Sequence, residues 1–85
     1  MAKVEIYTQF GCGYCARALR LFRDKMVTVE ETDVTFGGAA REAMRARAGG
    51  GNTVPQIFID NVHVGGCDDL FELDLDGKLD LLLGL

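Results

Sequence analysis

Two cysteines, Cys12 and Cys15, are separated by a glycine and a tyrosine in the stretch QFGCGYCARAL, residues 9–19. Thiols at this spacing can form a structural disulfide, supply half of a metal site, or work as a redox pair. Residues three apart on a helix share a face, which brings two sulfur atoms close enough to bond with modest adjustment. The spacing alone leaves the metal and redox interpretations open.

The surroundings of the pair distinguish the two thiols. The apolar period changes from strand-like to helical at the pair, so we expect both cysteines at the start of a helix. Unpaired backbone N–H groups and the positive end of the helix dipole favour a negatively charged sulfur there, most of all at Cys12. Cys15 lies on the apolar stripe with Leu19 and Phe22, so it should be less exposed and less ionised. We predict that Cys12 is the nucleophile and Cys15 the resolving thiol.

Length and composition describe an ordinary globular domain. The chain has 85 residues, of which 48% are hydrophobic and 26% charged, so we expect one domain over residues 1–85. It has no signal-peptide pattern and no apolar run that could span a bilayer, which predicts a cytoplasmic protein that binds no membrane. In that reducing compartment, a close cysteine pair is more often catalytic or metal-binding than a disulfide framework.

The net charge of −4 is unevenly distributed along the chain. Besides Lys3, seven basic residues lie between positions 17 and 47, namely Arg17, Arg20, Arg23, Lys25, Arg41, Arg45 and Arg47, whereas seven acidic residues and only one basic residue, Lys78, lie from Asp60 onward. No dense basic stripe with interleaved aromatic residues is present, so we expect no nucleic-acid partner. The charges either solvate the surface or steer an anionic substrate.

The elements that position the cysteines follow from the same patterns. Alternation predicts a strand over Lys3–Thr8, and helical spacing predicts a helix from Cys12 to Met26. β-Branched residues predict a second strand over Val27–Asp33. An alanine-rich segment opened by Gly37-Gly38 predicts a helix to Ala48.

The second half of the chain predicts a hairpin and two helices. The runs Gln56–Ile59 and Val62–Val64 flank Asp60-Asn61, the spacing of a tight two-residue turn. A helix with acidic residues in its first turn follows to about Leu75, and a short leucine-rich helix comes last. Because a βαβ unit needs parallel strands and a hairpin needs antiparallel ones, we expect an α/β fold with a four-stranded mixed sheet and helices on both faces.

A structural zinc site is the alternative use of the thiols. It needs four ligands, and the chain offers only Cys12, Cys15, Cys67 and His63. His63 falls within the second strand of the predicted hairpin, where a half-exposed sheet position is the simpler interpretation. We therefore favour a redox pair over zinc.

Three motifs together resemble a glutaredoxin over essentially the whole chain: the dithiol pair, NTVPQIFID at 52–60, and VGGCDDL at 64–70. The resemblance implies a thioredoxin-like fold and a glutathione-dependent thiol-disulfide oxidoreductase that reduces protein disulfides and glutathionylated proteins. Glutathione would be the co-substrate, and the chain would be a monomer. Thioredoxins are less similar because their active site carries tryptophan, which this chain lacks.

The resemblance also implies one side of a glutathione site. Pro55 has no N–H and holds the preceding residue extended, so Thr53 and Val54 present backbone groups to which a peptide-like ligand can pair. The family has this proline in the cis form, and a trans proline closing a loop is the alternative. Tyr14 should pack on the ligand. Gln56 matches a position that helps hold the glycyl carboxylate, unless it is an ordinary strand residue.

The VGGCDDL segment supplies the other side of that site. In the family, the residues that match Gly66, Cys67 and Asp68 form the part of the site that binds the γ-glutamyl end of glutathione. Backbone N–H groups at the helix start can hold its carboxylate, and an acid can meet its ammonium group. Helix capping alone is the alternative role for Asp68 and Asp69.

Three residues depart from the family pattern. Gln9 stands where many glutaredoxins carry a lysine, and we considered Arg45 or Arg47 as the replacing cation. Gly11 stands where threonine is common.

Gly13 replaces the usual proline of the dithiol loop. Some glutaredoxins with a small residue here bind a [2Fe-2S] cluster between two subunits, each giving its first active-site cysteine and one glutathione. Cluster binding by a dimer, with Cys12 as the only metal ligand of the chain, is therefore the alternative function.

Overall fold

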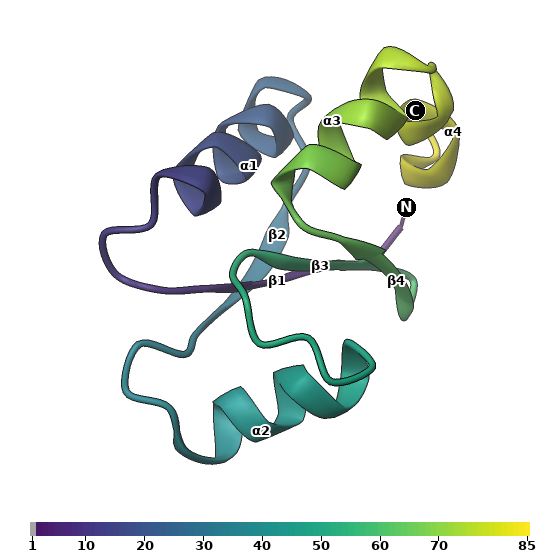
Figure 1. Cartoon of the computed structure of the whole chain (residues 1–85). Helices are drawn as coiled ribbons and strands as arrows, with labels where there is room; N and C mark the ends of the chain where they lie inside the picture. Colours follow the sequence, from purple (N-terminus) through teal and green to yellow (C-terminus); the bar gives the residue numbers. More distant parts are fainter. Residues whose placement is uncertain (1) are drawn as a thin grey trace.

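The computed structural model describes residues 2–85, and its helices and strands follow the predicted order. In chain order they are β1 (Val4–Thr8), α1 (Gly13–Asp24), β2 (Val29–Asp33), α2 (Gly38–Arg47), β3 (Gln56–Ile59), β4 (Val62–Gly65), α3 (Cys67–Leu75) and α4 (Lys78–Leu83). Helices α1 and α3 lie on one face of the sheet and α2 on the other (Figure 1). Within residues 2–85, no helix is long and apolar enough to cross a membrane.

The sheet is mixed, as predicted, with the strand order β2-β1-β3-β4. Strand β1 pairs in parallel with β2 and antiparallel with β3, and β3 pairs antiparallel with β4. Because β1 and β2 are parallel, the loops that follow them leave the sheet at the same end. A hydrogen bond of 2.8 Å from the Phe10 backbone N–H to Thr35 Oγ1 joins these two loops.

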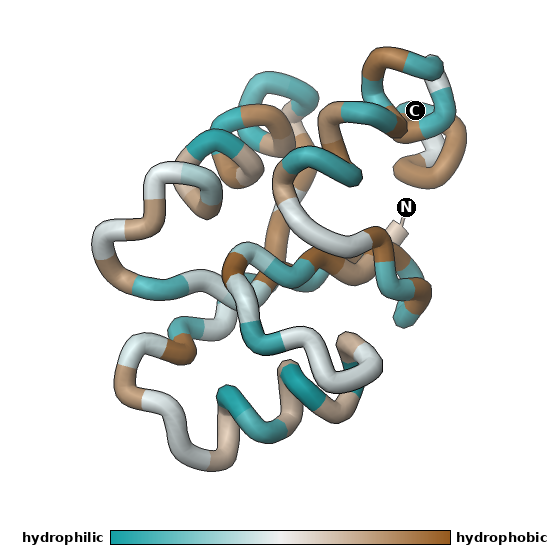
Figure 2. Tube along the Cα trace, viewed as in Figure 1, coloured by the Kyte–Doolittle hydropathy of each residue, from teal (hydrophilic) through white to brown (hydrophobic). Residues whose placement is uncertain are grey.

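The sheet divides the core into two clusters. The larger one, between the sheet and α1, α3 and α4, contains Val4, Ile6, Ala18, Phe22, Ile57, Ile59, Leu70, Leu79 and Leu83. The smaller one, under α2, contains Tyr7, Val34, Met44 and Phe58. Both faces of β1 are therefore buried, which explains why Tyr7 is buried as well as its neighbours on the opposite face. Figure 2 shows hydrophobic residues along the central strands and alternating hydrophilic and hydrophobic residues along α2.

Two predicted boundaries are wrong by two residues each. Helix α1 ends at Asp24, and β2 begins at Val29. Between them Met26 has a φ of 61°, and the N–H groups of Met26 and Val27 donate to carbonyls in the last turns of α1, both at 2.9 Å. These N–H groups complete the helix end, so they cannot join the sheet.

The predicted hairpin turn is confirmed. Asp60 and Asn61 both have positive φ, 51° and 66°, which is the conformation of the tight turn that matches strand twist. At the end of β4, Gly65 has a φ of 117°, which residues with a side chain rarely adopt, and a Cβ there would collide with the Asp69 carboxylate. Glycine is therefore required where the chain turns from β4 into α3.

Candidate active site

Cys12 occupies the N-cap position of α1, at the turn between β1 and the helix. Its Sγ accepts a hydrogen bond of 3.2 Å from the Cys15 backbone N–H, and as a thiol it donates to the Val54 carbonyl oxygen at 3.8 Å. A backbone N–H donor and the positive end of the helix both favour a negatively charged sulfur. The expectation that the pair opens the first helix is confirmed.

Cys15 lies one turn further along α1 and faces the core. Only 3% of its surface is exposed, whereas Cys12 is partly exposed. Burial first, and a hydrogen bond with Cys12 second, raise the pKa of the Cys15 thiol to about 12, against the opposing effect of a hydrogen bond from the Gln9 backbone. Cys15 is thus the more buried thiol, as predicted, and it is protonated at neutral pH.

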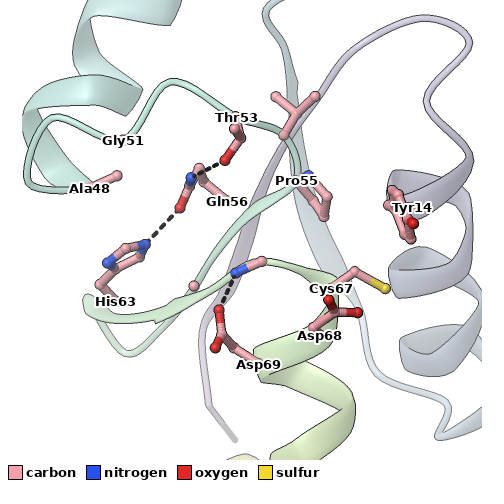
Figure 3. Close-up of a pocket in the computed structure, with 13 residues that line it drawn as sticks. Tyr14, Ala48, Gly51, Thr53, Pro55, Gln56, His63, Cys67, Asp68 and Asp69 are labelled. Atoms are coloured by element: carbon pink, nitrogen blue, oxygen red, sulfur yellow. Dashed lines mark hydrogen bonds between the residues drawn. The ribbon is translucent and has the colours of Figure 1, made fainter.

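A groove of about 350 Å³ opens beside the pair, between the start of α1, the segment before β3 and the start of α3 (Figure 3). It is lined by all eight residues that the sequence predicted for a glutathione site: Tyr14, Thr53, Val54, Pro55, Gln56, Gly66, Cys67 and Asp68. Cys12 lies at the edge of this groove through its contact with Val54. The Val54–Pro55 peptide bond is cis, as the resemblance implied.

Asp68 and Asp69, the two acidic residues at the start of α3, have different roles. Asp69 Oδ2 accepts a hydrogen bond of 3.0 Å from the Gly66 N–H, so Asp69 caps the helix (Figure 3). Asp68 is exposed and lines the groove, and its carboxylate makes no hydrogen bond within residues 2–85. Cys67 is buried, which raises the pKa of its thiol. Of the two acids, Asp68 is therefore the one whose carboxylate is available to a ligand.

Gln56 and His63 line the groove and are hydrogen-bonded to each other. The Gln56 side chain is buried, its Nε2 donates to Thr53 Oγ1 at 3.2 Å, and its Oε1 lies 2.7 Å from His63 Nε2. The His63 ring also stacks on Phe58, with 5.0 Å between ring centroids. One polar end of Gln56 thus holds Thr53 in the segment before Pro55, and the other end holds His63 on β4.

The structure does not bring the four residues considered for a zinc site together. Within residues 2–85 no group of three or more His, Cys, Asp or Glu side chains could hold a metal ion. His63, held by Gln56 and Phe58, is placed as a sheet and groove residue, and it is exposed where we expected half-exposure.

Arg41 is the residue that sequence reasoning missed. Its guanidinium donates to Gln9 Oε1 at 2.9 Å, and to the Asn52 side-chain and backbone oxygens at 2.8 and 2.6 Å. It therefore places a positive charge beside the residue that replaces the family lysine. The arginines we had considered lie elsewhere: Arg45 pairs with Glu42, and Arg47 pairs with Glu5. Only the position of Arg41 at the start of α2, after the β2 loop, could have indicated this role.

A partly exposed thiol at a strand-to-helix turn, a buried thiol behind it and a cis-proline beside it define a thiol-disulfide oxidoreductase of the thioredoxin-like class. Comparison with known proteins specifies the family. The sequence model of the glutaredoxin family matches residues 4–64. Glutaredoxin 3 of Escherichia coli strain K12 is 53% identical over 83 residues, which cover 98% of this chain and 99% of that protein. The chain belongs to the glutaredoxin family.

Solved structures confirm the thioredoxin-like fold. The solution structure of glutaredoxin from Brucella melitensis matches with a TM-score of 0.83 at 52% identity, covering 98% of this chain and 89% of that one. The crystal structure of a buckwheat glutaredoxin–glutathione complex matches with a TM-score of 0.87 at 30% identity, covering 98% of this chain and 77% of that one.

Proposed function

We propose that this glutaredoxin reduces protein disulfides and mixed disulfides between proteins and glutathione, with glutathione as the electron donor. The observation that carries the proposal is the position of Cys12 Sγ, which accepts a backbone N–H at the start of α1 and lies at the edge of the groove. The buried, protonated Cys15 lies directly behind it.

The reaction with a protein disulfide has three steps. The Cys12 thiolate attacks one substrate sulfur, forms a mixed disulfide, and releases the other substrate sulfur as a thiolate that takes up a proton. Cys15 then loses its proton and attacks Cys12 Sγ, which forms the Cys12–Cys15 disulfide and releases the second substrate thiol. Two glutathione molecules return two electrons and two protons to the pair and become glutathione disulfide.

The reaction with a glutathionylated protein needs Cys12 alone. The thiolate attacks the glutathionyl sulfur, the protein thiol leaves, and one further glutathione displaces the glutathionyl group from Cys12 as glutathione disulfide. The two reactions therefore differ in whether Cys15 takes part.

The groove offers complementary groups to each part of an extended tripeptide. The Val54 backbone can pair with the backbone of the cysteinyl residue, as an added strand. The N–H groups at the start of α3 suit the γ-glutamyl carboxylate, and Asp68 suits its ammonium group. Arg41 does not line the groove, but it bonds Gln9 and the Asn52 backbone oxygen next to Thr53, and we assign it to the glycyl carboxylate. The buckwheat relative with TM-score 0.87 was solved as a glutathione complex, which supports this ligand.

Three serine variants test the proposal. We expect Cys12→Ser to lose both reactions, and Cys15→Ser to lose protein-disulfide reduction while it still removes glutathione from proteins. Ala43→Ser is the control, because Ala43 is exposed on α2 and does not line the groove, so this variant should leave both reactions within about twofold of the parent. Rates are measured with a protein disulfide and a glutathionylated protein. Full activity of Cys12→Ser would refute the assignment.

A [2Fe-2S] cluster remains the alternative function, and a single chain does not satisfy its ligand needs. Within residues 2–85, Cys12 is the only partly exposed cysteine, and no group of three potential ligands exists. Cysteine-ligated clusters of this type take four protein ligands. The remaining ligands would have to come from a second copy and from glutathione, so a coloured dimer after anaerobic reconstitution would support this alternative.

A further inference from the structure

Two phenylalanines project from the loops that follow β1 and β2. Within residues 2–85, Phe36 is the most exposed of the large hydrophobic residues, at 97%, and Phe10 follows at 88%, the same value as Leu75. Phe10 belongs to the loop before Cys12, and Phe36 to the loop before α2. Neither contributes to either core cluster. Folding of this chain therefore gains little from these two aromatic side chains.

The two loops are held in a fixed relation to each other. The Phe10 backbone N–H donates to Thr35 Oγ1 at 2.8 Å, and Thr35 is the neighbour of Phe36. Thr35 is itself held by Asp33 Oδ1, which accepts from its backbone N–H at 2.8 Å and also from its hydroxyl. Phe10 and Phe36 are therefore carried by connected backbone segments at one end of the sheet (Figure 1).

The aromatic pair, Phe10 and Phe36, lies outside the groove, and the loop that carries Phe10 leads directly into the reactive cysteine. Phe10 precedes Cys12 by two residues, and neither phenylalanine lines the groove that Tyr14, Pro55 and Cys67 form. A tripeptide in that groove would leave both rings uncovered. A protein whose disulfide reaches Cys12 has further surface around its cysteine, and that surface must lie against the residues bordering Cys12.

We propose that Phe10 and Phe36 dock the protein part of the substrate, and that they favour cysteines with an aliphatic or aromatic side chain beside them. This inference rests on the proposed function. Hydrophobic rings at a reaction centre gain binding free energy when an apolar side chain removes them from water. The preference belongs to the protein substrate, because a small glutathione disulfide has no side chain to reach the pair.

The size of the aromatic pair fits a transient substrate better than a second copy of the chain. An aromatic side chain buries about 150–250 Å². Two of them supply roughly half of the about 800 Å² per partner in a standard stable interface, whereas transient redox encounters lie at the small end of the range. The pair is thus suited to brief contact with many protein substrates.

A double variant, Phe10→Ser with Phe36→Ser, tests the inference on two glutathionylated peptides that differ only in leucine or serine beside the cysteine. We expect the parent to prefer the leucine peptide by about tenfold in kcat/KM, through a lower KM; tenfold corresponds to about 1.4 kcal/mol. The double variant should lose this preference and keep the parent's rate on glutathionylated free cysteine. Leu75→Ser removes an equally exposed residue, 88%, from the end of α3 and should keep the preference.

The possible outcomes are distinguishable. No preference in the parent, or a preference retained by the double variant, would overturn the docking inference while leaving the glutathione-dependent reaction intact. Absence of activity on every glutathionylated substrate would instead refute the proposed function. If sedimentation showed a dimer for the parent and a monomer for the double variant, the pair would bind a second copy, and the inference would also be overturned.

Discussion

At the scale of single residues, Cys12 and Cys15 carry the same thiol group, but Cys12 is partly exposed and Cys15 is buried. Cys12 accepts a hydrogen bond at the exposed end of α1, and Cys15 is 3% exposed with its pKa raised to about 12. At pH 7 we expect iodoacetamide to modify Cys12 in the folded protein and to leave Cys15 and Cys67 unmodified until urea unfolds the chain. Mass spectrometry of the labelled peptides measures this. Equal labelling of Cys15 in the folded state would contradict the burial that separates the two roles.

The raised pKa of Cys15 also makes stability depend on pH in the alkaline range. An unfolded cysteine loses its proton near pH 8.5, whereas folded Cys15 keeps its proton to about pH 12. Between these values the folded chain binds more protons, so the free energy of unfolding falls as the pH rises; below about pH 8.5 the contribution is complete. Urea unfolding at pH 7.5 and pH 10 measures the fall. The free energy of unfolding of Cys15→Ala should fall less steeply with pH, and an equal slope in the parent and the variant would contradict the raised pKa of Cys15.

Residue chemistry could be predicted from the sequence where it depends on local spacing. The cysteine pair, Pro55 and the Cys67–Asp68 corner are defined by their neighbours in the chain, and the structure brings them to one groove. Arg41 could not be predicted this way, because its contact with Gln9 joins residues 32 apart and depends on how α2 crosses the sheet. The division of tasks between Asp68 and Asp69 likewise required the geometry of the helix start.

At the scale of elements, α2 carries three arginines with different surroundings. Arg47 donates to both carboxylate oxygens of Glu5 at 3.0 Å, and its guanidinium lies 4.0 Å from the Phe58 ring centroid. This pair is more than two-thirds buried, so we expect Arg47→Ala to lower the free energy of unfolding by about 1–3 kcal/mol at pH 7. Arg45→Ala, from the exposed side of the same helix, should change it by less than about 0.5 kcal/mol. Urea unfolding compares them.

The effect of Arg47→Ala should shrink in acid. The hydrogen bond from Arg47 lowers the pKa of Glu5, so the contribution of this carboxylate is present above its ordinary pKa and is lost as the pH falls through the folded value. A difference between parent and variant that is as large at pH 3 as at pH 7 would show that the loss comes from packing instead of the ion pair.

Arg41, four residues before Arg45 on the same helix, should affect the binding of glutathione. It bonds both Gln9 and the Asn52 backbone oxygen, which precedes the Thr53–Val54 segment of the groove. We expect Arg41→Ala to raise the KM for glutathione by about tenfold, with kcat changed by less than about twofold, and Arg45→Ala to change neither. Steady-state kinetics with varied glutathione measures this. A fall in kcat alone would place Arg41 in a different step.

The order and type of the helices and strands could be predicted from the sequence, but the residues at which they begin and end could not. The β-branched residues Val27 and Thr28 suit a strand, yet the N–H of Val27 completes the end of α1. The strand propensity of Val27 cannot decide whether its N–H joins the sheet or completes the helix end, because the hydrogen-bond partner is set by where the preceding helix stops.

At the scale of the whole molecule, the last helix is part of the main core. Leu79 and Leu83 of α4 are buried against β1, β3 and α1 residues, whereas Leu81 between them is 78% exposed. A domain of this size has a free energy of unfolding of about 5–15 kcal/mol, and a buried leucine cut to alanine costs about 2–5 kcal/mol. We expect Leu79→Ala to show a loss in this range and Leu81→Ala almost none, measured by urea unfolding. Equal losses would mean that α4 packs differently.

Ala2 and Leu85 lie near each other and far from the reactive cysteine. They border one surface pocket, and Figure 1 shows the start of β1 and α4 across the molecule from the loop that leads into α1. A linker or solid support attached at either end should therefore leave the reactive thiol facing outward. Immobilised or fused forms of this protein can be built through both ends with the groove open to bulky substrates.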